Sequence, residues 1–313
     1  MALPLDGLPE RVRLVEVGPR DGLQNEPEVV PTDVKVAFVE ALADAGLRWI
    51  EVGSFVRPDR VPQMADTDEV VRRLRPREGV TYIALVPNLR GLERALTCGV
   101  RAIAVFTAAT DAFSEANIGM SVKQSVRTFR EVVRQAQGAG ILVRGYVSVA
   151  WWCPYTGRVD PQRTREVALG LLEMGCADVG IADTIGAATP REVQQLLDFL
   201  LRDIPAHRIG VHFHDTRGTG LANVLASLQM GITTVDASAG GLGGCPFAPG
   251  ALGNVATEDV VYMLHGMGLQ TGVDLDRLCT ASRQLEAALG RRLPSRYLRA
   301  GPVRPAADHV RYS

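Results

Sequence analysis

Short apolar runs recur along the chain, and longer stretches with a helical spacing of apolar positions separate them. The runs predict eight strands, at residues 13–17, 49–52, 81–86, 102–106, 142–149, 178–182, 209–214 and 234–238. The stretches between them predict amphipathic helices, the clearest at 34–45, 122–139 and 190–203. Because strands that alternate with helices form βαβ units, the pattern predicts a parallel sheet.

Eight such units favour a closed (β/α)8 TIM barrel over an open, doubly wound sheet. An open sheet usually carries a glycine-rich phosphate loop after its first strand, and Gly18-Pro19-Arg20-Asp21-Gly22 is a poor match to one. Glycine also stands between predicted helices and strands, where it favours helix ends, at positions 46, 99, 140, 175 and 231. We expect one catalytic domain over residues 1–313. It comprises the barrel at about 12–270, a glycine-rich active-site loop after the eighth strand, and short C-terminal helices with a tail at about 271–313.

The composition narrows the class of protein. Of 313 residues, 46% are hydrophobic and the formal net charge is -1, so a large core is available and nucleic acid is not the expected partner. The first residues lack the long apolar core of a signal peptide or a membrane span, and no membrane partner is expected. Five cysteines without a CxxC pair are typical of a reduced, cytoplasmic protein.

Polar residues gather at the predicted ends of the strands, where TIM barrels form their active sites. They are Arg20, Asp21, Glu51, Tyr146, Ser148, Asp183, Thr184, His212, His214 and Asp215. Side chains two apart on a strand point to the same face, so His212 and His214 could hold one metal ion, with Asp21 as an anionic ligand. The alternative is a hydrogen-bonded histidine pair beside an aspartate that caps a loop.

The expected cofactor is one divalent metal ion. Carboxylate and imidazole ligands suit Mg or Mn, and imidazole also admits Zn or Co. Arg20 would place a fixed cation beside the metal and could stabilise an enolate oxygen, which is compatible with an ion pair to Glu51 or Asp183. Cys245 lies in a glycine-dense loop, where it is either a proton relay or redox-responsive thiol, or an inert small residue. The pair Trp151-Trp152 either lines the mouth or packs in the core.

Three blocks together resemble a known family. They are Gly18-Pro19-Arg20-Asp21-Gly22-Leu23-Gln24-Asn25-Glu26, His212-Phe213-His214-Asp215 and Gly240-Gly241-Leu242-Gly243-Gly244-Cys245-Pro246. The chain is similar over about residues 14–274 to the 3-hydroxy-3-methylglutaryl-CoA (HMG-CoA) lyases, a family of metal-dependent C–C lyases on TIM barrels.

The resemblance implies a role for each matching residue. The metal ligands would be Asp21, His212, His214 and Asn254, the last of which is implied only by the resemblance. The catalytic residues would be Arg20, Cys245, Glu51 and Asp183. The substrate contacts would be Arg20, Tyr146, Thr184 and Thr110. The implied reaction is a retro-Claisen cleavage of an acyl-CoA, HMG-CoA, to acetyl-CoA and acetoacetate, and we expect a homodimer.

Two departures from the family pattern leave the substrate open. Arg217-Gly218-Thr219 stands where Tyr-Gly-Gln is frequent, and Trp151-Trp152 precedes Cys153-Pro154 where smaller residues are usual. One alternative is a lyase for a related 3-hydroxy-3-alkylglutaryl-CoA or a citramalyl-CoA-like substrate. The others are a condensing synthase of the isopropylmalate or homocitrate type, and a non-catalytic barrel that binds an acyl-CoA.

Overall fold

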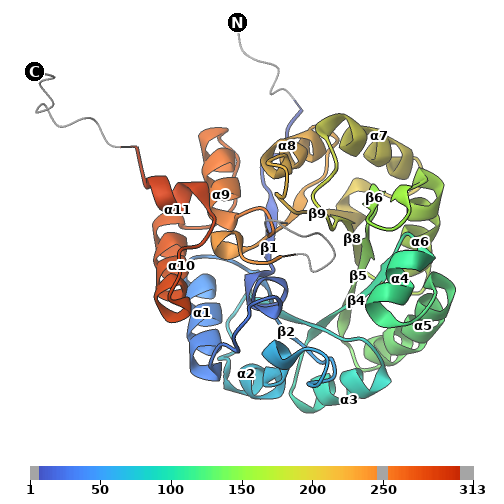
Figure 1. Ribbon diagram of the computed structural model, residues 1–313, viewed down its shortest axis with the longest axis horizontal. Coiled ribbons are helices and arrows are strands. Elements are labelled where there is room, and N and C mark those ends of the chain that lie inside the picture. Colours follow the sequence, from blue (N-terminus) through green and yellow to red (C-terminus); the bar gives the residue numbers. More distant parts are fainter. Residues whose placement is uncertain (1–6, 245–252, 304–313) are drawn as a thin grey trace, which may run out of the picture.

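Eight parallel strands close into a barrel, and helices surround it (Figure 1). The computed structural model describes residues 7–244 and 253–303. Around the barrel the strand order is β1-β10-β9-β8-β5-β4-β3-β2, and β1 pairs with both β2 and β10. The strands are β1 Arg13–Glu16, β2 Trp49–Ser54, β3 Thr81–Leu85, β4 Ala102–Ala108, β5 Leu142–Ser148, β8 Asp178–Asp183, β9 Ile209–Phe213 and β10 Thr234–Ala237. The predicted (β/α)8 barrel is confirmed. A small antiparallel pair, β6 Trp152–Cys153 and β7 Gly157–Arg158, follows β5.

The helices that cover the barrel bury one face against it, and several of them begin at a side-chain cap. They are α1 Thr32–Asp44, α2 Thr67–Arg73, α3 Leu89–Thr97, α4 Asp111–Ile118, α5 Val122–Gly138, α6 Pro161–Glu173, α7 Pro190–Leu201, α8 Gly220–Gln229 and α9 Thr257–Gly266. At the start of α5, for example, Ser121 and Gln124 form a capping box. The ends of the predicted strands, and those of the three clearest predicted helices, lie within two residues of the observed ones.

Glycine closes the predicted helix-to-strand junctions. Gly46, between α1 and β2, has a φ of +101°, and a Cβ there would lie 2.2 Å from the carbonyl oxygen of Gly272. A side chain at this position would therefore meet both a strained backbone and a collision. The other four junction glycines also have positive φ values.

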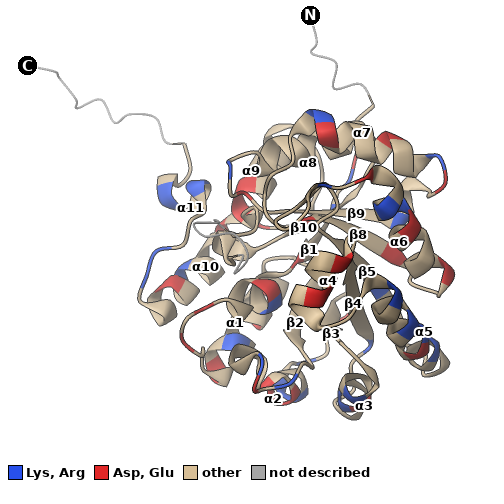
Figure 2. Ribbon diagram, turned by 45° about the vertical axis from the view of Figure 1, so that its right-hand side comes forward, with Lys and Arg blue, Asp and Glu red and all other residues tan. Residues whose placement is uncertain are grey.

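Two further helices follow the barrel. α10 Leu275–Leu289 packs against α1 and α9, and α11 Arg296–Ala300 packs against α9. Asp259 anchors this segment, because its carboxylate accepts hydrogen bonds from the Ser295 hydroxyl at 2.8 Å and the Tyr297 amide at 2.7 Å. Acidic and basic residues are spread over the outer helices, with both signs on α2, α6 and α7 (Figure 2). Within 7–244 and 253–303, no helix has the length and apolar character needed to cross a bilayer.

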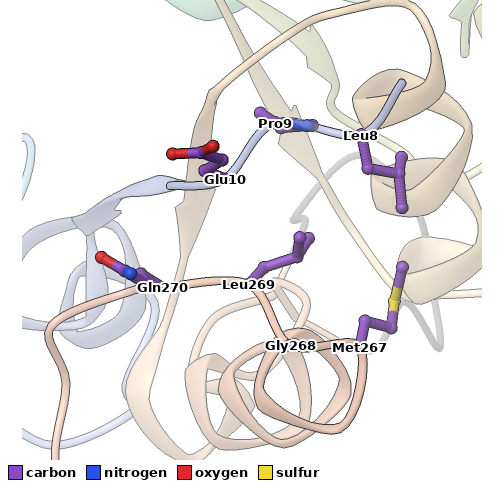
Figure 3. Close-up of a pocket in the computed structure, with 7 residues that line it drawn as sticks. All are labelled: Leu8, Pro9, Glu10, Met267, Gly268, Leu269 and Gln270. Carbon is purple, nitrogen blue, oxygen red and sulfur yellow. The ribbon is translucent and has the colours of Figure 1, made fainter. Parts of the chain in front are cut away.

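The two ends of the barrel differ. Where the strands begin, Leu8–Glu10 and Met267–Gln270 line a pocket of about 420 Å³ (Figure 3). This pocket lies beside the start of β1, since Arg11 bridges to Gln270. The polar residues singled out in the sequence lie at the opposite end, where the strands finish. The candidate site is therefore at the C-terminal mouth, as expected for a TIM barrel.

Candidate metal centre

A tight turn after β1 presents Arg20 and Asp21 to the mouth. Residues Gly18–Gly22 form one π-helical turn, in which the amides of Arg20, Asp21 and Gly22 all donate to the Val17 carbonyl at 2.7–3.2 Å. The turn fits closely against the segment after β10, because a Cβ on Gly22 would lie 2.8 Å from the Leu242 Cβ. Glycine at this position allows that close approach.

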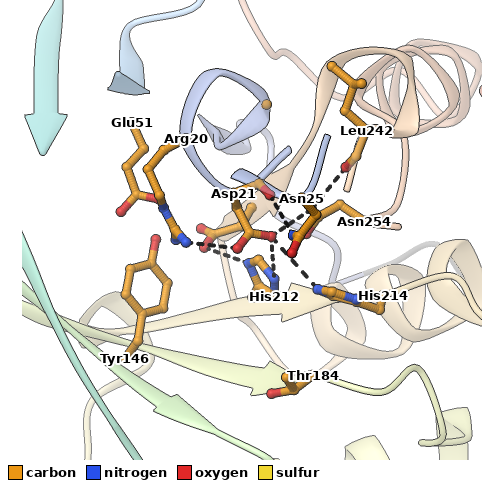
Figure 4. A network of polar contacts seen from close by, with 12 residues as sticks. Arg20, Asp21, Asn25, Glu51, Tyr146, Thr184, His212, His214, Leu242 and Asn254 are labelled. Carbon is orange, nitrogen blue, oxygen red and sulfur yellow. Dashed lines mark hydrogen bonds and ion pairs between the residues drawn. The ribbon is translucent and has the colours of Figure 1, made fainter. Parts of the chain in front are cut away.

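Asp21, His212 and His214 converge on one point. Each offers a ligand atom, and these atoms lie within 4.8 Å of one another. The Asp21 Oδ2 is 4.0 Å from the Nε2 of His212 and 3.8 Å from the Nε2 of His214. Asn254 joins them, and its Nδ2 donates to Asp21 Oδ2 at 2.8 Å and to the Leu242 carbonyl at 3.1 Å (Figure 4). The structure thus brings together the four residues expected to bind metal.

The charge states of this cluster suit a cation. Burial favours a higher pKa for Asp21, but Arg20 and the two imidazoles hold that pKa well below its usual range. Burial lowers the pKa of His214 to about 4, and the neighbouring His212 adds to the effect. The His214 Nδ1 is buried without a hydrogen-bond partner among the described residues. An ionised Asp21 and a neutral His214 are in the ligand state that a divalent cation requires, so these residues fit one. Burial lowers the pKa of His212, but Asp236 and Asp21 raise it overall, so His212 releases its proton when a cation binds.

Arg20 is held beside the cluster by two carboxylates. Its guanidinium contacts Glu51 Oε2 at 2.6 and 2.7 Å and Asp21 Oδ1 at 2.8 Å. All three side chains are largely buried, which fixes the direction of the guanidinium. The expected ion pair with Glu51 is present. Arg20 forms no ion pair with Asp183, the alternative partner, among the described residues.

Asp183 and Thr184 lie at the end of β8, and their observed partners are backbone amides. The carboxylate of Asp183 accepts from the amides of Ala187 and Ala188 at 3.0 and 2.9 Å, and burial raises its pKa to about 6. Thr184 Oγ1 accepts from the Val149 amide at 2.8 Å. Val149 has a φ of 51°, a strained value for a β-branched residue. These contacts shape the loops after β5 and β8.

Of the remaining expected substrate contacts, Tyr146 is the one that faces the cluster. Its ring stands edge-on to that of His212, with centroids 6.2 Å apart (Figure 4). Thr110 caps α4 through the Phe113 amide and donates to Cys153 Sγ at 3.3 Å. The expected catalytic Cys245 lies outside the described residues.

The residues that depart from the family pattern form hydrogen bonds to neighbouring segments. Trp151 is 5% exposed, packs against Phe213 and donates to the Glu192 carbonyl at 3.1 Å, so it belongs to the core. Trp152 is half-buried and donates to Glu192 Oε1 at 3.1 Å. Arg217 donates to the carbonyls of Ile185 and Gly186 at 3.0 and 2.9 Å.

Sequence reasoning missed three buried carboxylates behind the site. Glu16 accepts from the amides of Gly18 and Ala239, and Glu258 accepts from that of Gly240. Asp236 lies 3.3 Å from His212 Nδ1 through its Oδ2. For Glu16 and Asp236 the available signal was a lone acidic residue inside an apolar run, because such a carboxylate needs a partner.

A comparison with known families agrees with this geometry. The model of the HMGL-like family matches residues 11–285, which is most of the chain. The chain belongs to the HMGL-like family. Enzymes of this family are metal-dependent, and Asp21, His212 and His214 form a cluster that could hold the ion.

Individual proteins of known name are similar to this chain over most of their length. A cytoplasmic 3-hydroxy-3-methylglutaryl-CoA lyase of Mus musculus is 49% identical, covering 96% of this chain and 87% of the relative. A 3-hydroxy-3-isohexenylglutaryl-CoA/hydroxy-methylglutaryl-CoA lyase of Pseudomonas aeruginosa is 50% identical, covering 94% and 98%. A solved HMG-CoA lyase from Acinetobacter baumannii, in complex with coenzyme A and 3-methylmalate, has a TM-score of 0.91 at 38% identity, covering 95% and 98%.

Proposed function

We propose that this protein is a divalent-metal-dependent carbon–carbon lyase that cleaves HMG-CoA to acetyl-CoA and acetoacetate. The observation that carries the proposal is the buried cluster of Asp21, His212 and His214 with Arg20 directly beside it. The cluster lies in a chain half identical to lyases of this substrate. We assign Asn254 as the fourth ligand and residues 1–313 as one catalytic domain.

In this reaction a general base takes the hydroxyl proton of the substrate, a carbonyl forms, and the electrons of the broken C–C bond become the enolate of acetyl-CoA. A bound divalent ion supplies Lewis-acid polarisation and a template for the substrate oxygens. Arg20 donates hydrogen bonds to the enolate oxygen, and Glu51 holds its guanidinium in place. Tyr146 forms part of the wall of the substrate site, with Thr184 and Thr110 as further contacts. Cys245 returns a proton to the enolate carbon, and Asp183 organises the loop after β8.

For the metal, we propose Mg or Mn, with Zn or Co as the alternatives that two imidazoles admit. The mixed set of carboxylate, imidazole and amide supports this choice. Metal-free protein, reloaded with each ion in turn, should show the highest turnover with Mg or Mn. A preference for Zn would contradict the assignment.

A lyase for 3-hydroxy-3-alkylglutaryl-CoA is the second candidate. It is favoured by the Pseudomonas aeruginosa relative, whose name includes an isohexenyl substrate. The ratio of kcat/KM for HMG-CoA and for longer 3-alkyl analogues decides between the two.

We also propose a cytoplasmic homodimer. The cytoplasmic relative supports the location, although mitochondrial relatives are known as well. Light scattering should give twice the mass of one chain, and a monomer at micromolar concentration would contradict the proposal. Fractionation of cells that express the protein tests its location.

The decisive experiment is cleavage of HMG-CoA by wild type, Arg20→Ala and Arg165→Ala. Arg165 is the matched control, because it pairs with Asp203 on the outer surface. Loss of a donor to a developing oxyanion typically costs about 100- to 1,000-fold in kcat, so Arg20→Ala should lose at least that much while Arg165→Ala retains activity. Near-normal turnover by Arg20→Ala would refute the enolate role, and no turnover by metal-loaded wild type would refute the substrate.

A further inference from the structure

A line of charged side chains crosses the inside of the barrel and ends at His212. Arg13 contacts Asp178 at 2.9 Å, and Asp178 contacts Arg144 at 3.1 Å. Arg144 then contacts Asp236 Oδ1 at 2.8 Å, and Asp236 contacts His212. Arg144 and Asp236 are almost completely buried. The line connects the start of the strands to the metal cluster.

The two strands between β5, which carries Arg144, and β10, which carries Asp236, leave room for this line. On β9, a Cβ at Gly210 would lie 2.5 Å from the Arg144 guanidinium. On β8, a Cβ at Gly180 would lie 2.5 Å from the ring of Tyr146, whose hydroxyl is 3.2 Å from Arg144. A side chain at position 210 would displace Arg144, and one at position 180 would displace Tyr146, which contacts Arg144.

We propose that Asp236 is a positioning residue that fixes the tautomer of His212. A neutral imidazole has one N–H donor and one lone pair, on different nitrogens. An ionised carboxylate only accepts, so Asp236 holds the proton on Nδ1 and leaves the lone pair on Nε2, the nitrogen that faces Asp21. Arg144 contributes through its ion pair with the second oxygen of Asp236, at 2.8 Å.

Asp236→Asn is the sharpest variant, because an amide of the same shape has one acceptor oxygen where the carboxylate has two. When that oxygen faces Arg144, the NH2 group faces His212 Nδ1 and makes that nitrogen an acceptor. The proton then moves to Nε2, and the lone pair points away from the metal. Asp178→Asn is the matched control. It removes a carboxylate from the same Arg144 without touching His212.

The inference rests on the proposed metal centre but not on the substrate, so direct metal binding is the measurement. Electron paramagnetic resonance of added Mn²⁺ gives the dissociation constant for each variant. Loss of such a supporting carboxylate typically weakens metal binding about 10- to 100-fold, which is expected for Asp236→Asn, with less than about a 3-fold change for Asp178→Asn. Equal binding by wild type and Asp236→Asn, or equal weakening in both variants, would overturn the positioning role. Absence of Mn²⁺ binding by wild type would instead overturn the metal centre.

Nitrogen-15 NMR of the metal-free wild type tests the tautomer without the Asp236→Asn variant. The chain has five histidines, so His212→Gln identifies the signal by its loss. The spectrum is recorded at alkaline pH, where the ring is neutral, and a proton on Nδ1 of His212 alone supports the inference. A proton on Nε2 contradicts it.

Discussion

Glu16 is a fully buried carboxylate that joins three parts of the site. Its Oε1 accepts from the amides of Gly18 at 2.7 Å and Ala239 at 2.8 Å, and its Oε2 accepts from the Thr257 hydroxyl at 2.7 Å. It therefore ties the end of β1 to the segment after β10 and to the start of α9. Burial raises its pKa from 4.5 to about 7, against the opposing effect of these hydrogen bonds.

Glu16→Gln should stabilise the protein at alkaline pH and leave it nearly unchanged at acidic pH. Glutamine has the shape of protonated glutamate, so its oxygen can accept from both amides while its NH2 donates to Thr257. The folded wild type holds a proton on Glu16 that the unfolded chain releases near pH 4.5. Stability is therefore lost as pH rises through about 7. One pKa unit corresponds to about 1.4 kcal/mol. The unfolding free energy of the variant, relative to that of wild type, should therefore rise by roughly 2–3 kcal/mol between pH 5 and pH 8.

Calorimetric or circular-dichroism melting at pH 5 and pH 8 checks this prediction. At roughly 2 °C per kcal/mol for a large domain, the Tm of the variant should rise relative to wild type by about 5 °C across the interval. Glu173→Gln is the control, since Glu173 is exposed, and its difference from wild type should not change with pH. A Glu16→Gln difference that is constant with pH, or that becomes more destabilising at pH 8, would refute the reasoning.

Three further outcomes follow from the structure. Gly180→Ala should cost about 1–3 kcal/mol in unfolding free energy by melting, because its Cβ would lie 2.5 Å from the Tyr146 ring. Gly266→Ala, whose Cβ meets nothing within 4 Å, should cost nothing, and equal costs would contradict the packing argument. Thr184→Val should lose about 1–3 kcal/mol because the Val149 amide loses its acceptor, whereas Thr184→Ser should retain most of the stability. Chelation should abolish lyase turnover, and added Mn²⁺ should restore it; a rate that survives complete metal removal, measured by elemental analysis, would contradict the metal centre.

The barrel could be predicted because its signal is local. Each strand is a short apolar run and each major helix has its own amphipathic period, so the alternation is visible without tertiary information. The rule that barrel sites form at strand ends then placed Arg20, Asp21, His212 and His214 at one mouth, where the structure has them. Asn254 was different, since it lies outside any periodic element and only the family resemblance pointed to it.

The partners of the site residues could not be predicted in the same way. Asp183 and Thr184 were expected at the mouth and lie there, but their hydrogen bonds go to backbone amides whose positions depend on loop conformation. A lone acidic residue in an apolar strand indicates that Asp236 has a partner, but the sequence does not show which residue that partner is. Its partners Arg144 and His212 are on other strands, and only the closed barrel brings the three together.

The charged side chains inside the barrel require an explanation beyond stability. TIM-barrel interiors are usually filled by layers of branched apolar side chains, whereas here Arg144 and Asp236 lie inside. Buried ion pairs add little net stability, because removing both charges from water costs about as much as their attraction returns. Stability alone therefore does not explain why an arginine and two aspartates lie inside the barrel, with Gly180 and Gly210 leaving the space they need. The proposed positioning role of Asp236 accounts for the arrangement, since its contact with His212 orients a metal ligand from within the barrel.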